Sequence, residues 1–376
     1  MKKSIFGAAL VVGLVSSVGL ANAADPTFKD PTVSPDVLVT YPYIDGELIW
    51  ELQGDFTTDS DDPDAELNDV FGYLEIALAL HFNQYFQINA ALIGEPVLDP
   101  GPMEDRFFED HGLYLEVLNA QVNFSDNTNL VAGKFGPGFG TAWDATPGIY
   151  GVDFAEDYEL AEFIGFGVNH TFDGGNAGEV TFGANIFFAD TTFLSDSIGT
   201  RRGRTRLTDG GAGNTEELDN FSFTLDGTEL PSMPGFSWHL GYRHLSAGLG
   251  DVADENGFAV GFIQEADLGD ERTATFNFEY AVFDNFGGSA DDASYLTAGL
   301  TLADGPWHTD FAGTLRNIDV AGGPDSDDVL FQASIGYVDA NDIDWNVGYK
   351  FAEEGGVDSH TFGFFVTKAI EFSTNE

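Results

Sequence analysis

The most informative feature of the chain is an alternation of apolar and polar positions with a period of two. In residues 273–283, TATFNFEYAVF, Phe276, Phe278 and Tyr280 alternate with Asn277 and Glu279. This period predicts a β-strand with one apolar and one polar face. In a soluble sandwich the Phe face would be the core, whereas in a membrane barrel it would face lipid and the polar face would line a pore.

Sixteen segments carry this pattern, with little helical periodicity between them, and the weakest is FSFTLDG around residues 221–227. The predicted strands are residues 44–54, 69–82, 84–93, 113–125, 128–135, 160–172, 178–190, 219–226, 234–246, 255–266, 270–283, 292–304, 305–317, 328–339, 341–353 and 358–372.

The connections between these segments alternate in length. Long connections at residues 55–68, 94–112, 136–159 and 191–218 are separated by short turns such as SDNT at 125–128. Long loops on one rim and short turns on the other are the layout of bacterial outer-membrane barrels, which have even strand numbers. A soluble sandwich has no reason to separate loop lengths in this way, so the Phe face is predicted to point toward lipid.

The N-terminal residues predict export. Lys2 and Lys3 precede an apolar run at residues 5–20, and an Ala-Asn-Ala site ends at Ala23. These features predict a signal peptide over residues 1–23, with a membrane anchor as the alternative. No later stretch reaches the roughly 18 consecutive apolar residues of a spanning helix, so a membrane crossing would have to use β-structure.

Composition narrows the choice further. Sixty-three acidic residues against 14 Lys and Arg give a formal net charge of −49, which disfavours nucleic-acid binding because phosphate contacts need clustered cations. A hydrophobic content of 43% is too high for a disordered chain. The sequence has no cysteine, so disulfides cannot hold the exported chain together. A closed barrel can, because it has no free strand edge.

Together, the signal peptide, sixteen strands, alternating loops and aromatic final strand resemble the Gram-negative porins over essentially the whole mature chain. The stretch LVAGKFGPGFGTAWDATPGIYG, residues 130–151, is similar to the strand-to-constriction region of siderophore and phosphate porins. The resemblance implies an all-β transmembrane antiparallel barrel over residues 44–372 in the outer membrane of a Gram-negative bacterium. An extended segment (24–43) precedes it, a tail (373–376) follows it, and a homotrimer is one possible assembly. Porins typically end on an aromatic residue, whereas here four residues follow Phe372.

The connection at 136–159 follows the fifth strand, where sixteen-stranded porins fold a loop into the pore. Three glycines permit tight bends, and Trp143, Tyr150, Phe154 and Tyr158 are suited to packing against the inner wall. Its charges are all acidic: Asp144, Asp153, Glu156, Asp157 and Glu159. Arg243 and Arg316, which alternation places in the lumen, are predicted to oppose them across a constriction. The alternative is an external loop capped by its own aromatic residues.

Alternation also gives a set of charged and histidine side chains that are predicted to face the lumen. They are Glu47, Glu51, Glu75, Lys134, Glu179, His239, Arg243, Glu279, His308, Asp310, Arg316, Asp344 and Lys350. Acids outnumber bases, which favours cations in the pore. In the last strand the same counting places Lys368 on the lipid face, where it must either snorkel to the interface or lie beside a register-shifting bulge.

A cluster of arginines lies in the longest connection, on the predicted outer rim: Arg201, Arg202, Arg204 and Arg206. Three interpretations are open. The arginines pair with acidic loops around them, they dock anionic groups of lipopolysaccharide or an anionic solute, or they contact a neighbouring subunit.

Catalytic and metal-binding motifs are the next feature of the sequence to consider. The sequence contains neither G-x-S-x-G nor H-E-x-x-H, and the acidic stretches at 57–69 and 322–329 lack the calcium-loop spacing. We therefore expect no enzyme, cofactor or metal site. The sequence predicts a cation-preferring porin for passive diffusion of small hydrophilic solutes and ions. The alternatives are a ligand-specific porin for a nutrient such as a sugar or siderophore, a surface adhesin or scaffold barrel, and a soluble exported β-protein.

Overall fold

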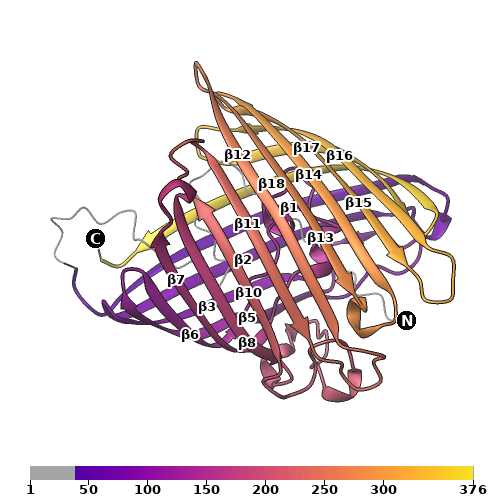
Figure 1. The fold of residues 1–376 in the computed structure, drawn as a ribbon. Coiled ribbons are helices and arrows are strands. Elements are labelled where there is room, and N and C mark those ends of the chain that lie inside the picture. Colours follow the sequence, from indigo (N-terminus) through magenta and orange to yellow (C-terminus); the bar gives the residue numbers. More distant parts are fainter. Residues whose placement is uncertain (1–38, 376) are drawn as a thin grey trace.

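The computed structural model describes residues 39–375, which form an all-β barrel of sixteen long antiparallel strands (Figure 1). The barrel strands are β1 (Tyr43–Ser60), β2 (Asn68–Asn83), β3 (Phe86–Pro96), β5 (His111–Ser125), β6 (Thr128–Phe135), β7 (Phe163–Asp173), β8 (Glu179–Ala189), β10 (Asn220–Thr228), β11 (Phe236–Leu245), β12 (Glu255–Gly269), β13 (Arg272–Asp284), β14 (Asp292–Asp304), β15 (Trp307–Asp319), β16 (Ser326–Val338), β17 (Asp344–Glu354) and β18 (Val357–Ser373). The predicted signal peptide and most of the predicted segment 24–43 lie outside the described residues.

The barrel closes because the first and last strands pair with each other. β1 pairs antiparallel with β18 from Asp45↔Ser373 to Ser60↔Ser359, and every other barrel strand pairs with its two neighbours in the chain. All sixteen predicted strands are confirmed, including the weakest, which is β10. Closure satisfies the backbone groups around the whole circumference and leaves no edge.

The two rims of the barrel differ as the sequence predicts. Connections such as 97–110, 136–162 and 190–219 lie on one rim, and short turns such as 126–127 and 270–271 lie on the other. The turn between β10 and β11, residues 229–235, is longer than the other turns of its rim and contains Pro231 and Pro234. The long loops add two short strands, β4 (Arg106–Phe107) beside β2 and β9 (Ile198–Gly199) beside β5.

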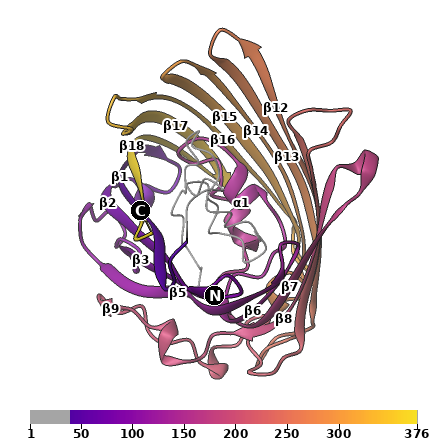
Figure 2. The same cartoon turned by 90° about the vertical axis from the view of Figure 1, so that its left-hand side faces the viewer.

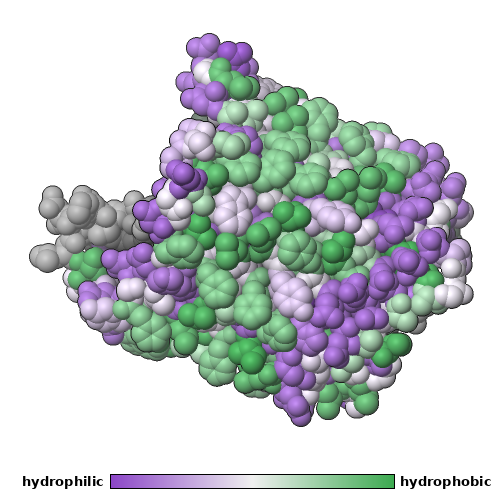
Figure 3. Space-filling view, viewed as in Figure 1, coloured by the Kyte–Doolittle hydropathy of each residue, from purple (hydrophilic) through white to green (hydrophobic). Residues whose placement is uncertain are grey.

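The two strand faces separate by polarity, which answers the question raised by residues 273–283. Phe276 and Tyr280 are exposed on the outer face, while Asn277 and Glu279 are 4% and 1% exposed on the inner face. Figure 3 shows a broad apolar band across this outer surface with hydrophilic patches at its ends. A band of this kind matches the lipid-facing belt of a membrane barrel.

No helix within residues 39–375 is long and apolar enough to cross a membrane.

Lys368 lies in a regular part of the last strand. Pairing with β1 runs without a shift from Thr361 to Ser373, so no bulge moves this residue off the outer face. Its ammonium group donates a hydrogen bond to the carbonyl of Asn341, in the short turn between β16 and β17. The side chain therefore snorkels to the rim, the first of the two predicted solutions.

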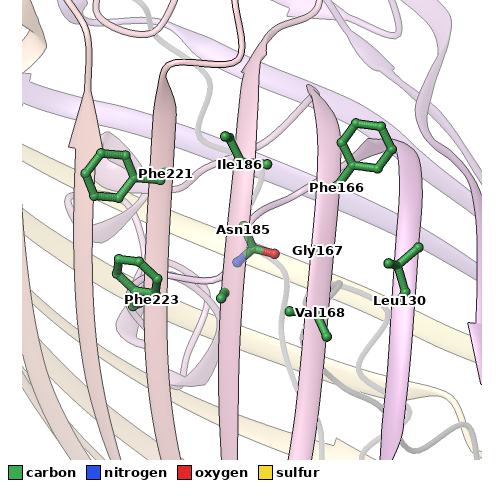
Figure 4. A pocket seen from close by; sticks show the side chains of 9 residues that line it. Leu130, Phe166, Gly167, Val168, Asn185, Ile186, Phe221 and Phe223 are labelled. Carbon is green, nitrogen blue, oxygen red and sulfur yellow. The ribbon is translucent and has the colours of Figure 1, made fainter. Parts of the chain in front are cut away.

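A depression of about 550 Å³ lies on the outer wall, over β6, β7, β8 and β10 (Figure 4). Its lining is almost wholly apolar and includes Phe166, Val168, Ile186 and Phe223, all exposed on the outer face. Ala184, at the same level, leaves the space between the larger side chains. Because it belongs to the apolar belt and not to the lumen, we assign this depression to the lipid-facing wall.

Candidate functional site

The connection between β6 and β7 folds into the barrel, as the sequence predicts. Figure 2, which looks into the barrel, shows its short helix α1 (Ala142–Ala145) inside the ring of strands. A second turn of helix, η2 (Ala155–Tyr158), follows in the same segment. We call residues 136–162 the inner loop.

Aromatic packing fixes the inner loop against one part of the wall. Phe139, Trp143 and Tyr158 of the loop share a buried cluster with Phe283 and Tyr295, whose side chains point inward from β13 and β14. The rings of Tyr158 and Tyr295 meet edge to face with centroids 5.0 Å apart. Inward-facing aromatic residues break the polar pattern of the lumen, and this contact gives the physical reason.

Glu279 of β13 is the main polar anchor of the inner loop. Its carboxylate accepts hydrogen bonds from the backbone N–H of Thr141 (2.6 Å), the hydroxyl of Thr141 (2.9 Å), the N–H of Ala142 (3.2 Å) and the hydroxyl of Tyr158 (2.7 Å). Two of these donors are backbone groups at the start of α1, which an anionic acceptor satisfies well. Glu279 thus holds the loop instead of serving as a free charge in the pore.

Further hydrogen bonds attach the loop to other strands. The amide of Asn277 on β13 donates to the hydroxyl of Thr146 (3.0 Å), and the amide of Gln332 on β16 donates to the carbonyl of Pro147 (2.9 Å). The hydroxyl of Tyr150 donates to Asp55 on β1 (2.7 Å). The loop is therefore fastened along the β13–β18 side of the wall and at β1.

Two of the five predicted loop carboxylates are ion-paired with that wall. Asp153 lies 2.7 Å from the ammonium of Lys350, and Asp157 lies 2.7 Å from the guanidinium of Arg316. The Arg316 guanidinium also lies 4.2 Å from the ring centroid of Phe154. These contacts neutralise Asp153 and Asp157 and hold the loop in place.

Arg243 and Arg316 lie against the loop, not across a passage from it. Arg243 donates to the carbonyl of Tyr158 (2.5 Å) and pairs with Glu255 (2.6 Å). Arg316 is shared among Asp157, Asp328 (2.7 Å) and Glu354 (3.0 Å). The two arginines therefore do not oppose the loop acids across a constriction, as the sequence predicted. Their charge is balanced by acids beside them on the wall and on the loop.

The other three loop carboxylates, Asp144, Glu156 and Glu159, form no ion pair within residues 39–375. One oxygen of Glu156 is buried without a hydrogen-bond partner there. Burial raises the pKa of Asp144 to about 6, and burial followed by repulsion from Asp144 raises that of Glu159 to about 7. Burial and neighbouring carboxylates also raise the pKa of Glu156.

These three carboxylates lie near glutamates on the opposite part of the wall. Glu75 is an electrostatic neighbour of Asp144, Glu116 of Glu159, and Glu95 of Glu156. Together with two residues of β1, they define what we call the acidic wall: Glu47, Glu51, Glu75, Glu95 and Glu116. None of the five forms an ion pair within the described part of the chain.

Glu95 and Glu116 are absent from the set of lumen-facing residues that alternation predicts. Glu95 is the second-last residue of β3 and lies inside a stretch predicted as loop. Glu116 lies at a β-bulge, where Ala91 and Leu92 of β3 pair with Val117 and Leu115, so Glu116 itself has no partner residue. Its even spacing from Tyr114, a buried residue, was the one available signal for an inward orientation.

The arginine cluster lies in the loop between β8 and β10. Arg201 pairs with Asp196, Arg202 pairs with Glu162 (2.6 Å), and Arg204 donates to the carbonyl of Thr191 (2.6 Å). The backbone of Arg206 hydrogen-bonds to Asp209. Two of the four charges are thus paired with acids, one in the same loop and one in the inner loop, while the predicted docking of lipopolysaccharide or of an anionic solute stays a prediction.

Histidines of the lumen pair with carboxylates. His308 contacts Asp310 at 2.7 Å and Asp344 at 3.1 Å, and His239 contacts Asp226 at 2.5 Å. Within residues 39–375 no group of three or more His, Cys, Asp or Glu residues is arranged to hold a metal ion.

No model of a protein family matches the chain, and no curated protein matches it in sequence. In structure it is similar to OprB of Pseudomonas putida, with a TM-score of 0.57 at 13% identity over 88% of this chain and 94% of that one. The outer membrane channel DcaP of Acinetobacter baumannii gives 0.55 at 11% identity over 89% and 99% of the two chains. OpdK of Pseudomonas aeruginosa, in a structure with vanillate, gives 0.51 at 10% identity over 88% and 99%.

The fold is that of a Gram-negative outer-membrane channel. Identities of 10–13% extend the likeness to architecture alone. The chain shares with those channels the closed antiparallel barrel.

Proposed function

We propose that this protein is an outer-membrane porin through which small hydrophilic solutes and ions diffuse passively, with a preference for cations. The observation that carries the proposal is a set of neighbouring carboxylates without ion pairs on the inner loop and on the acidic wall, and we place the passage between them. Unpaired carboxylates line both sides, Asp144, Glu156 and Glu159 on the loop and the five glutamates on the wall. Fixed charges of one sign at a narrow point raise the local concentration of counter-ions.

The arrangement supports transport without catalysis. The inner loop makes its contacts through structural hydrogen bonds, and the closely spaced acid–base groups, such as Glu279 with Tyr158, are used to anchor it. The structural neighbours are channels, which agrees with a pore.

Reconstitution tests the channel. Purified protein in planar bilayers should give discrete conductance steps, and liposomes containing it should swell in uncharged sugars at a rate that falls steadily with sugar size. Flux that stays proportional to concentration supports passive diffusion. Saturation at millimolar sugar would favour the ligand-specific porin, and a barrel without conductance would favour the adhesin or scaffold.

A further inference from the structure

We infer that the acidic wall binds elongated organic cations, and that linear diamines and polyamines are the solutes this channel favours. This inference rests on the proposed function and deepens it by naming a substrate class. It follows from the unpaired state of the carboxylates, from their spacing, from the apolar surface between them and from an internal cation that already occupies one end of the wall.

Unpaired carboxylates mark the wall as a place that lacks its counter-charge. Glu47 is 9% exposed and forms no hydrogen bond or ion pair within residues 39–375. Glu51 is 4% exposed, and its hydrogen bond is a 3.5 Å contact from the hydroxyl of Thr367. Burying ionised carboxylates with so few partners is costly unless a cation balances them or a proton neutralises them, and at the pH 8 of the test below a cation is favoured.

The spacing of the carboxylates suits an extended ligand. Glu47 and Glu51 lie four residues apart on β1, about 13 Å along the strand. Glu75 on β2 pairs in register with Ile49, which places it at a level between those two. No three acidic or histidine side chains in the described structure are placed to bind one metal ion together. A compact divalent ion can therefore contact fewer of these carboxylates than a linear molecule with a cationic group at each end.

Apolar and aromatic surface lies between the charges. The hydroxyl of Tyr73 donates to Glu75 (3.0 Å), and that of Tyr114 donates to Glu95 (2.5 Å), so each ring lies beside a carboxylate. Ala77 and Ile93 are buried among them on the same strands. Methylene groups of a diamine can pack on this surface while its ammonium groups meet the carboxylates.

An internal cation shows how one end of the wall binds positive charge. The guanidinium of Arg202 lies 3.8 Å from the ring centroid of Tyr114 and pairs with Glu162 at 2.6 Å. It is also an electrostatic neighbour of Glu95. An organic cation would meet the same combination of ring and carboxylate at Tyr73 and Glu75.

The test is block of potassium current through the full-length protein in planar bilayers at pH 8, with putrescine and Mg²⁺ as probes of equal charge. Putrescine should halve the current at a concentration about tenfold below that of Mg²⁺. Replacing three wall residues together (Glu51→Gln, Glu75→Gln and Glu116→Gln) should raise the halving concentration of putrescine about tenfold. The control removes three charges from the exposed loop after β1 (Asp61→Asn, Asp62→Asn and Asp64→Asn) and should leave block unchanged.

Equal block by the two probes in the native protein, or unchanged putrescine block in the wall variant, would overturn the inference. If the triple variant does not form a barrel, Glu116→Gln alone should raise the halving concentration about threefold, and an unchanged value counts against the inference. A reversal-potential measurement in a salt gradient on the same membranes distinguishes failure of this inference from failure of the proposed function. Potassium preference without putrescine block rejects the diamine class alone, whereas anion preference rejects the proposed function.

Discussion

At the scale of single residues, the lumen uses its carboxylates in two different ways. Glu279, Asp153 and Asp157 are bound to the groups that hold the inner loop, whereas Asp144 and Glu159 form no ion pair in the described structure. The sequence offers no means of making this division. The partners of Asp153 and Asp157 are 197 and 159 residues away, so pairing depends on how the barrel closes.

Removing the anchor at Glu279 should loosen the inner loop. Glu279→Ala leaves four donors without their acceptor, and each buried donor left unsatisfied costs about 1–3 kcal/mol. Single-channel recordings should show a larger and noisier conductance than the native protein. Glu179→Ala, at an exposed residue where β8 begins, is the matched control and should behave like the native channel. A quiet, native-sized conductance in Glu279→Ala would show that other contacts hold the loop.

Selectivity should depend on pH through the loop carboxyls. A carboxyl group carries its charge above its pKa, and burial raises the pKa of Asp144 to about 6 and of Glu159 to about 7. Their charge, and with it the preference for potassium, should therefore grow between pH 5 and pH 8. Reversal potentials recorded at several pH values measure this directly. A potassium preference that falls as pH rises would contradict the assignment of these groups to the passage.

At the scale of elements, the strands were predictable because their signal is local. Alternation of apolar and polar residues along the chain shows which face of a strand is apolar, and the length of a connection shows at which rim of the barrel it lies. The predicted strand ends were less accurate. The structure extends β1 to Ser60, whereas the prediction stopped at residue 54, because the final residues TTDS (57–60) have no apolar face that would mark them as strand. The bulge at Glu116 was not predictable, since it depends on the register of β3 against β5.

Close approach of the inner loop to the wall gives a test at this scale. Gly148 has φ +91°, and a Cβ there would lie 1.8 Å from the side-chain nitrogen of Gln332. Gly148→Ala should therefore displace the loop from β16 and change the conductance. Gly175→Ala is the control, because its φ of +65° is equally left-handed while nothing lies within 4 Å of the added carbon. Equal conductance in both variants would mean that the loop does not pack on β16 in the working channel.

At the scale of the whole molecule, the fold follows from two requirements. The apolar outer belt needs a lipid environment, and every backbone group needs a partner, so a closed barrel satisfies both. The inner loop is fastened to the β13–β18 side of the wall and to β1, and we propose that ions pass between the loop and the acidic wall. The sequence indicated the barrel and the position of this loop, but which carboxylates anchor the loop and which stay without an ion pair became visible only in the closed barrel.

The purified protein should behave as a membrane barrel. It should need detergent, give a β-type circular dichroism spectrum and migrate on gels at a position that changes with heating. Its stability should be high because the closed strand pairing has no edge at which to unfold. A monodisperse protein without detergent would contradict the lipid-facing assignment of the outer belt.

The reversal potential in a KCl gradient tests the central claim most directly. The native channel should prefer potassium, because unpaired carboxylates line both sides of the passage. Neutralising three loop residues together (Asp144→Asn, Glu156→Gln and Glu159→Gln) should reduce that preference several-fold at low salt, with a smaller change at high salt where charges are screened. The same number of charges removed at Asp61, Asp62 and Asp64 should leave it nearly unchanged. An anion-preferring native channel, or a loop variant with native selectivity, would contradict the account.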